Sequence, residues 1–335
     1  MFKNSIIRFV FIIFGGKMFL HMITRRHIRV KVMQAFYAVT YDGIESPKEP
    51  SKFLKSSILK TFELHLVLVA LLKALHEHAQ TQFEIKKKQS SLVHTTEALG
   101  ARLVSNAFLN FLANHRLLNQ LLTAKKIKIW DLNFDYVHQL YAQILEEQTY
   151  KSYATLDHPS EKQERDFILW IYREVIAPKE QLFDFLEDEQ LTWSDDFPVV
   201  NTFIVKQLKT CYPDQEISFE LPDVSTIQEE IQFGEQLLKT LLAHSEALQK
   251  EIKGKTPNWE AERIVSLDNL LLQMAIAELL YFDEIPPRVT LNEYLEIAKD
   301  YSTPKSNIFI NGVLDKLVKE FETSNRMHKQ GRGLQ

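Results

Sequence analysis

The amino-acid sequence predicts an all-α fold. Only 9 of its 335 residues are glycine, and none lies between Ala101 and Phe233. β-Sandwiches and barrels need frequent turn residues between short strands, and this composition does not supply them. Apolar residues instead recur with helical spacing, as in the stripe formed by Ile28, Val32, Ala35, Phe36 and Val39.

The composition also excludes several kinds of functional site. The chain has no GxGxxG or GxxxxGK[ST] segment, and the backbone of such loops is what holds nucleotide phosphates. The single cysteine, Cys211, rules out a disulfide framework within the chain and a cysteine-based zinc cluster. His76 and His78 are two residues apart and point to different sides of a helix, so they do not predict a metal site. We therefore expect no cofactor and no enzymatic activity.

The N-terminal region divides at Met22. Residues 1–21 contain a short apolar run that Arg8 interrupts, and they lack the cleavage site of a signal peptide. They are expected to be a non-structural leader or a mis-assigned start, with Met22 as the physiological first residue. The first helix is then predicted over residues 22–41.

Residues 42–224 are predicted to be a long helical region. A loop is expected over 41–52 because it combines Gly43, Pro47 and Pro50 with charged residues. Helical patterns follow at about 53–80, 92–122, 131–150, 160–176, 178–190 and 197–210. Pro213 and Pro222 mark the strongest candidate boundary, at residues 211–224.

Residues 225–322 are predicted to form a C-terminal helical bundle, followed by a disordered polar tail at 323–335. A strongly apolar helix is expected over about 264–281, and the last helix is expected to end near Phe321. The predicted N-terminal caps are two capping boxes, Ser225 with Gln228 and Thr290 with Glu293, and the pair Thr303-Pro304.

Positive charge gathers at the N-terminal end of the chain. Residues 1–41 contain seven Lys and Arg residues and no Asp or Glu, whereas the whole chain has a net charge of -4. Arg25, Arg26 and Arg29 lie at the start of a predicted helix, where the helix dipole disfavours cations by some tenths of a kcal/mol. Since no acidic residue is near them in the sequence, an external anion such as an RNA phosphate is the favoured explanation.

Two segments resemble the NusB family of bacterial transcription antitermination factors. The first is TRRHIRVKVMQAFYA, with its RRxxRxxxxQxxY order. The second contains AxxEL, P-x-x-V-x-x-NE-x-x-x-x-A and FxNGVLD in close succession. The resemblance covers about residues 22–41 and 225–321. It implies a NusB-like helical bundle with a large additional helical region between the first helix and the C-terminal bundle.

The resemblance also implies a function. Family members are cytoplasmic RNA-binding proteins without catalysis. They bind boxA-like single-stranded RNA of ribosomal RNA operons together with NusE, a small-subunit ribosomal protein, and join the elongating RNA polymerase. The RNA-contacting residues that it implies here are Arg25, Arg26, Arg29, Gln34, Lys305, Ser306 and Phe309. The NusE-facing residues that it implies are Tyr37 and Asp268.

Other interpretations stay open at the level of sequence. Phe309 has a second reading as a core residue, because Ile310 and Val313 beside it are also apolar. The whole chain could be a protein-binding helical adaptor whose middle region recruits a partner. It could also be an RNA-binding module that assists ribosomal RNA modification, with the catalytic part on another chain. No membrane association is expected.

Overall fold

The computed structural model describes residues 22–41, 48–89, 100–215, 218–253, 255 and 266–330. The leader predicted at 1–21 lies outside these ranges. Within them all regular structure is helical, apart from one isolated bridge between Tyr212 and Gln215. The all-α prediction is therefore confirmed. None of the described helices combines the length and the apolar character needed to cross a bilayer.

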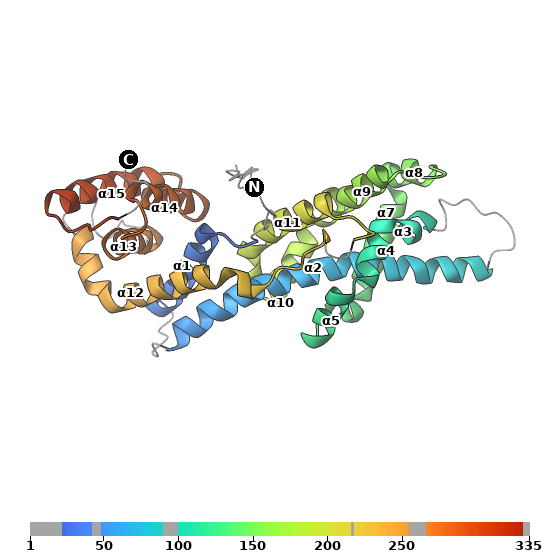
Figure 1. The fold of residues 1–335 in the computed structure, drawn as a ribbon, viewed down its shortest axis with the longest axis horizontal. Helices are drawn as coiled ribbons and strands as arrows, with labels where there is room; N and C mark the ends of the chain where they lie inside the picture. The colour runs from blue at the N-terminus through green and yellow to red at the C-terminus, as the bar shows by residue number, and fades with distance from the viewer. Residues whose placement is uncertain are drawn as a thin grey trace.

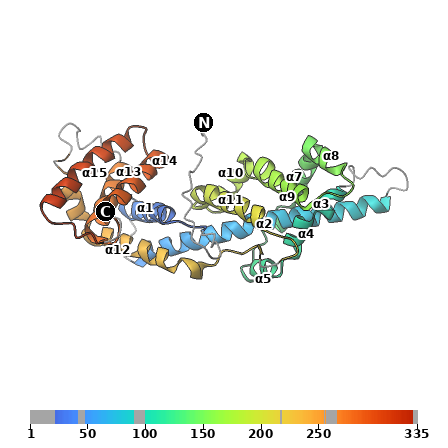
Figure 2. The same cartoon turned by 45° about the horizontal axis from the view of Figure 1, so that its top comes forward.

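The helices form an elongated molecule with a bundle at one end (Figure 1). The bundle consists of α12 (Gln228–Ile252), α13 (Ser266–Tyr281), α14 (Pro287–Tyr301) and α15 (Ser306–Thr323). Helix α1 (Arg25–Tyr41) lies between this bundle and the other helices in both views (Figures 1 and 2). It packs against α12, α13 and α14 on one side and against α2 on the other.

Helix α2 runs along the longest dimension of the molecule (Figure 2). It spans Lys48–Gln89, 42 residues, and is longer than the helix predicted at 53–80. The loop predicted over 41–52 is wrong from Lys48 onward. Pro50 does not prevent the helix because it lies in the first turn, where the backbone N–H has no helical acceptor.

The remaining helices of the middle region pack either on α2 or on helices that contact it. Their bounds are α3 (Ala101–Ser105), α4 (Ala107–Asn114), α5 (Arg116–Ala124), α6 (Ile129–Leu132), α7 (Phe134–Glu146), α8 (Gln148–Ala154), α9 (Glu161–Trp170), a π-helical turn (Ile171–Ile176), α10 (Glu180–Glu189) and α11 (Trp193–Thr210). The single helix predicted at 92–122 is broken at Asn106, whose side chain accepts hydrogen bonds from the N–H groups of Phe108 and Leu109. Apolar periodicity does not predict a break made by a cap of this kind, because the apolar spacing continues across it.

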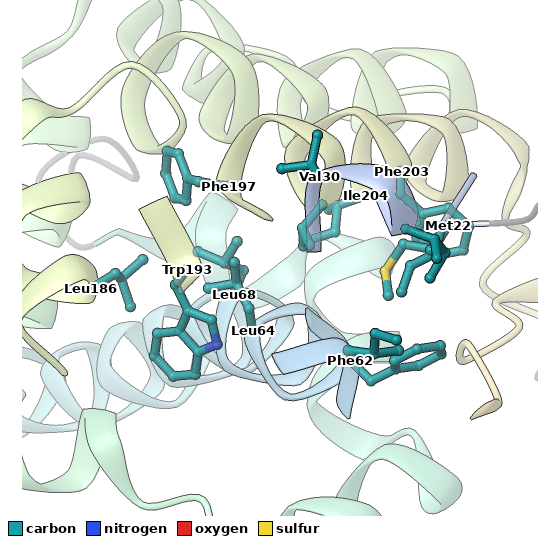
Figure 3. Close-up of a cluster of buried hydrophobic side chains, with 14 of the residues drawn as sticks. Met22, Val30, Phe62, Leu64, Leu68, Leu186, Trp193, Phe197, Phe203 and Ile204 are labelled. Atoms are coloured by element: carbon teal, nitrogen blue, oxygen red, sulfur yellow. The ribbon is translucent and has the colours of Figure 1, made fainter. Parts of the chain in front are cut away.

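The middle region and α1 share one apolar core. Figure 3 shows Met22 and Val30 in one cluster of buried apolar side chains with Phe62 of α2 and Phe203 of α11. Trp193 anchors the start of α11 there, because its Nε1 donates to the carbonyl of Lys60 at 2.8 Å. The middle region therefore packs onto the terminal helices and does not stand apart.

Three predicted helix starts are wrong. Asp223, not Ser225, caps the 3-10 turn Val224–Ile227 that precedes α12. Helix α14 begins at Pro287, so Thr290 and Glu293 lie inside it and make long-range contacts instead of a capping box. Helix α15 begins at Ser306, and Thr303 contacts the Ser306 hydroxyl at 2.8 Å without being the cap residue. In each case the polar side chain that the local pattern assigned to a cap interacts with a tertiary partner or a neighbouring side chain instead.

The tail beyond α15 is packed as far as it is described. Lys329 Nζ donates to the carbonyls of Glu278 and Phe282 at 3.0 and 2.8 Å, and the backbone N–H of Gln330 donates to the carbonyl of Asp283 at 2.9 Å. Arg326 pairs with Glu251 of α12 at 2.8 Å. The disorder predicted for 323–335 is therefore wrong for the part of the tail up to residue 330.

A buried histidine joins α2 to α11. His65 is fully buried, and its Nε2 lies 2.6 Å from Oε1 of Gln207. The amide nitrogen of Gln207 donates to the carbonyl of Glu220, so its oxygen must accept the proton on Nε2. Burial lowers the pKa of His65 to about 4. This imidazole is therefore neutral in the folded protein at pH 7.

We expect acid to destabilise the fold through His65. The unfolded chain binds this proton near pH 6.5 and the folded chain only near pH 4, so stability falls as the pH drops between these values. The loss from this residue should reach about 3 kcal/mol at pH 4. Urea unfolding measured between pH 4 and 7 should show a shallower dependence for His65→Gln, which cannot titrate. An unchanged dependence in that variant would contradict the assignment.

Candidate nucleic-acid interface

The three arginines predicted to bind RNA occupy different environments on α1. Arg29 is 2% exposed and makes two parallel hydrogen bonds, each 2.8 Å long, to the carboxylate of Glu278 on α13. Burial opposes its charge, but the hydrogen bonds and the negative charge of Glu278 outweigh burial and raise the pKa of Arg29. Arg29 is therefore a buried and paired guanidinium in this structure, and its contact with RNA stays a prediction.

Glu278 satisfies both of its oxygens within the bundle. Besides Arg29, it accepts from the Thr290 hydroxyl at 2.8 Å and from the Tyr294 hydroxyl at 3.2 Å, both on α14. This cluster joins α1, α13 and α14. Glu278 is a carboxylate within the apolar run from Met274 to Leu280 of α13, and that isolation in the sequence is the signal that indicates a buried ion pair.

Arg26 is partly available at the surface. Its side chain is 41% exposed, and it makes a two-pronged pair at 2.9 Å with Glu293 of α14. Glu296 and Asp300 also lie near enough to favour its charge and, after the hydrogen bond to Glu293, contribute to raising its pKa. An RNA phosphate at Arg26 would therefore compete with three carboxylates.

Arg25 is the most accessible of the three arginines. It is exposed, and its guanidinium lies 5.4 Å from the ring centroid of Phe233 on α12. Residues at the start of a helix are where a bound phosphate would also meet free backbone N–H groups. Arg25 is thus the arginine whose position fits direct contact with an anion.

The other flank of α1 contacts the middle region. Lys31 is fully buried, and its Nζ lies 2.7 Å from the carboxylate of Asp196 on α11. The same carboxylate accepts hydrogen bonds from Nε2 of His27 at 2.8 Å and from the hydroxyl of Thr61 at 2.9 Å. Burial raises the pKa of Asp196, but the hydrogen bond from His27 and the charge of Lys31 outweigh it, and the net pKa is below the usual value. Asp196 therefore connects α1, α2 and α11.

Gln34 is oriented by the same helix of the middle region. Its amide nitrogen donates to the carboxylate of Asp195, and the side chain is half-buried. Tyr37 lies one turn further along α1 and is 41% exposed. Of these two predicted site residues, Tyr37 faces outward and Gln34 is engaged by α11.

Two of the predicted residues near α15 are structural in this conformation. Asp268 is 4% exposed and accepts from the hydroxyl of Ser306 at 2.7 Å, and Ser306 is itself 2% exposed. This contact fixes the start of α15 on the first turn of α13. Neither side chain reaches the surface here, and the contacts of Ser306 with RNA and of Asp268 with NusE stay predictions. Lys305, directly before the helix, is exposed.

The apolar residue at the surface of α15 is Ile308 and not Phe309. Phe309 is 7% exposed and belongs to the core, whereas Ile308 is 74% exposed. Phe309 is therefore a core residue in this structure, and its contact with RNA stays a prediction. Periodicity could not decide between the two, because both are large and apolar and stand side by side in the sequence.

Gly312 lies one turn after Ile308 on the same exposed surface. An added Cβ there would meet no heavy atom within 4 Å. A glycine inside a helix costs about 0.5–1 kcal/mol relative to alanine. Packing within the chain does not explain this cost, in contrast to Gly234, where a Cβ would come within 2.7 Å of Ile28 and force α12 away from α1.

The described residues contain no group of three or more His, Cys, Asp or Glu side chains placed to hold a metal ion. His76 lies 3.1 Å from the carbonyl of Val104, and His78 lies 3.1 Å from His138. Cys211 is buried, and burial raises the pKa of its thiol to about 12, which leaves it unreactive.

Comparison with known proteins identifies the C-terminal part of the chain. The model of the NusB family matches residues 212–319. The chain is 44% identical over 102 residues to the transcription antitermination protein NusB of Salinibacter ruber, covering 30% of this chain and 64% of that protein. It is 41% identical over 98 residues to NusB of Chloroherpeton thalassium, covering 29% of this chain and 46% of the relative.

The solved structures give a weaker likeness. T. maritima NusB aligns with 41% of this chain and 85% of its own length, at 23% identity and a TM-score of 0.28. The matched parts span less than two thirds of the Salinibacter and Chloroherpeton relatives. The match at 212–319 holds α12, α13, α14 and most of α15, so the C-terminal part of this chain is similar to the NusB family, and the helices before it lie outside the family model.

Proposed function

We propose that this protein is a non-enzymatic transcription antitermination factor that binds boxA-like single-stranded RNA of ribosomal RNA operons. It does so with NusE and acts on elongating RNA polymerase in the cytoplasm. The observation that carries the proposal is the NusB-family domain, at 41–44% identity to proteins named for transcription antitermination. The accessible cations Arg25 and Lys305 and the exposed Tyr37 support it.

The proposed RNA surface is smaller than the sequence motif implies. It consists of Arg25, the exposed part of Arg26, Lys305, Ile308 and Gly312. Arginine and lysine neutralise phosphates, and an exposed apolar side chain beside a bare helix backbone leaves room for an unpaired base. Arg29, Ser306 and Phe309 support this surface from below, and Asp268 holds Ser306 in place.

The test measures binding of fluorescently labelled boxA-like RNA to the full chain, with and without NusE, over a range of salt concentrations. Arg25→Ala is expected to weaken binding about 5–10-fold and to reduce the salt slope by about 0.7, the value for one phosphate contact on a single strand. Arg173→Ala, an exposed arginine of the middle region, is the matched control. Arg29→Ala is unsuitable, because loss of RNA binding there would also follow from loss of folding.

The outcomes separate the alternatives. Equal RNA affinities of Arg25→Ala and Arg173→Ala would show that α1 is not part of the RNA interface. A chain that binds NusE but no RNA would instead be a protein-binding adaptor. Binding to mature ribosomal RNA in preference to leader RNA would favour a role beside an RNA-modifying enzyme.

Two substitutions of Gly312 are expected to have different effects, one raising the stability of the fold and the other weakening RNA binding. Gly312→Ala should raise the free energy of unfolding by about 0.5–1 kcal/mol, because alanine favours the helix and meets no neighbour. Gly312→Gln should leave the fold intact and weaken RNA binding, since the longer side chain occupies the proposed approach path. Lys319→Gln, exposed further along α15, is the control, and equal RNA affinity for both glutamine variants would contradict the proposal.

A further inference from the structure

We propose that the middle region carries a second contact surface for single-stranded RNA, at the corner where α5, α6 and α7 meet. This surface, called the lysine corner below, consists of Lys125, Lys126, Lys128 and Phe134. It lies in the part of the chain that precedes the NusB-family match. The inference rests on the proposed function, because it assigns to the same RNA a further point of contact.

The sequence around the lysine corner lacks negative charge. No Asp or Glu occurs from Ala98 to Trp130, although the whole chain is net acidic. Lys125, Lys126 and Lys128 are all exposed, and no ion pair involves them in the described part of the chain. Three ammonium groups within four residues repel one another, and an external polyanion would remove that repulsion.

The backbone of the lysine corner is held by a tight turn and by a buried contact with α2. Lys126 has a φ of 55°, in the left-handed region that non-glycine residues seldom adopt, and this turn separates α5 from α6. Trp130 on α6 is 4% exposed and donates through Nε1 to the carbonyl of Val67 on α2 at 2.7 Å. The lysine corner is therefore attached to α2 through α6, and α5 extends away from the body of the molecule there (Figure 1).

An exposed aromatic ring follows the lysines in the chain, six residues after Lys128. Phe134, the first residue of α7, is 62% exposed, whereas its neighbour Tyr136 stacks on Trp130 at 5.6 Å between ring centroids. An exposed ring beside phosphate-binding cations is the usual platform for an unpaired base in single-stranded RNA. Leu132, 80% exposed, adds apolar surface beside it.

The two carboxylates of the corner have a local explanation. Asp131 and Asp135 lie in the first turns of α6 and α7, where negative charge is favoured by the free N–H groups of the helix start. They reduce but do not cancel the positive charge of the three lysines and Arg116. An anionic lipid surface fits less well, since insertion needs a broad apolar helix face and the corner exposes only two large apolar side chains between the lysines and α7.

The experiment compares two RNAs on the full chain. A boxA-like RNA of about 10 nucleotides is short enough to occupy one surface, and one of about 40 nucleotides can occupy both. Alanine at all three lysines should leave binding of the short RNA unchanged. It should weaken binding of the long RNA about 10-fold and lower its salt slope by about 2. Phe134→Ala should weaken the long RNA about 5-fold without changing the slope, because stacking releases no counterions.

The matched control replaces Lys162, Arg173 and Lys209, exposed cations elsewhere in the middle region, with alanine. Long-RNA binding by the lysine-corner variant that equals binding by this control overturns the inference while the proposed function stands. A wild-type chain that binds neither RNA overturns both. Lysine-dependent binding to phosphatidylserine vesicles with unchanged RNA affinity would assign the corner to a membrane and overturn the inference as well.

Discussion

Glu278→Gln is expected to lower the free energy of unfolding by about 3–5 kcal/mol, the largest effect of any single substitution in the bundle. Arg29 and Glu278 are 2% and 0% exposed, so removing the carboxylate charge leaves a guanidinium in the core whose remaining charged partner is Glu293, at the longer distance of 3.6 Å. The glutamine amide would in addition direct a donor at the donors of Arg29. Urea or guanidinium unfolding, followed by circular dichroism, measures the change.

The bundle contains its own control for this experiment. Glu293→Gln removes a similar two-pronged partner from Arg26 and a longer contact of 3.6 Å from Arg29, but Arg26 and Glu293 are partly exposed, water can replace the carboxylate, and Arg29 keeps Glu278. The expected loss is no more than about 1 kcal/mol. A Glu278→Gln variant with a loss as small as that of Glu293→Gln would show that the buried pair contributes no more than a surface pair. Partial recovery of stability in Arg29→Met with Glu278→Leu would confirm that the unpaired charge is what destabilises.

Asp196→Asn is expected to lower stability by a similar amount, about 3–5 kcal/mol, through loss of the charge that faces Lys31. Lys31 and Asp196 are both fully buried, and their 2.7 Å contact is one of the polar links between α1 and α11, beside the contacts of His27 with Asp196 and of Gln34 with Asp195. Hydrogen exchange should become faster in α1 and α11 together, because both helices lose the same contact. The change in stability is measured by denaturant unfolding at pH 7.

Asp195→Asn is the matched control for Asp196→Asn. The neighbouring carboxylate is half-buried and accepts from Gln34, an uncharged side chain, so its loss leaves no buried charge behind. We expect a loss below about 1 kcal/mol. Equal losses in the two variants would contradict a special role for Asp196. The pKa of Asp196 is lowered in the folded chain, so its contribution is present at neutral pH and is lost as the pH falls below the usual aspartate range.

These two ion pairs explain how the extra helices and the NusB-family domain form one molecule. Arg29 and Lys31 lie on opposite flanks of the apolar stripe of α1, since successive residues of a helix are rotated by about 100°. One flank is paired with α13 and the other with α11. Helix α1 is therefore held from both sides, and Arg25 at its start keeps a fixed position relative to α12.

Several features followed from the sequence alone. The shortage of glycine and the apolar spacing determined the all-α fold, because helix formation depends on residues within a few positions of one another. The same local signals placed α9, α10 and α13 close to their observed bounds. The motifs of the last three helices indicated the similarity to the NusB family that the family model finds at residues 212–319, and the apolar stripe of Ile28, Val32, Ala35 and Phe36 is buried as predicted.

Only the tertiary structure decided which polar residues are free to act. Arg29 meets a carboxylate 249 positions away, and Gln34 meets one 161 positions away, so no local pattern contains the partner. The sequence could show that cations gather on α1 without an acidic neighbour, but not that two of them are neutralised inside the protein. The choice between Ile308 and Phe309 likewise depended on where α13 and α14 pack, because burial is set by neighbouring helices and not by hydrophobicity alone.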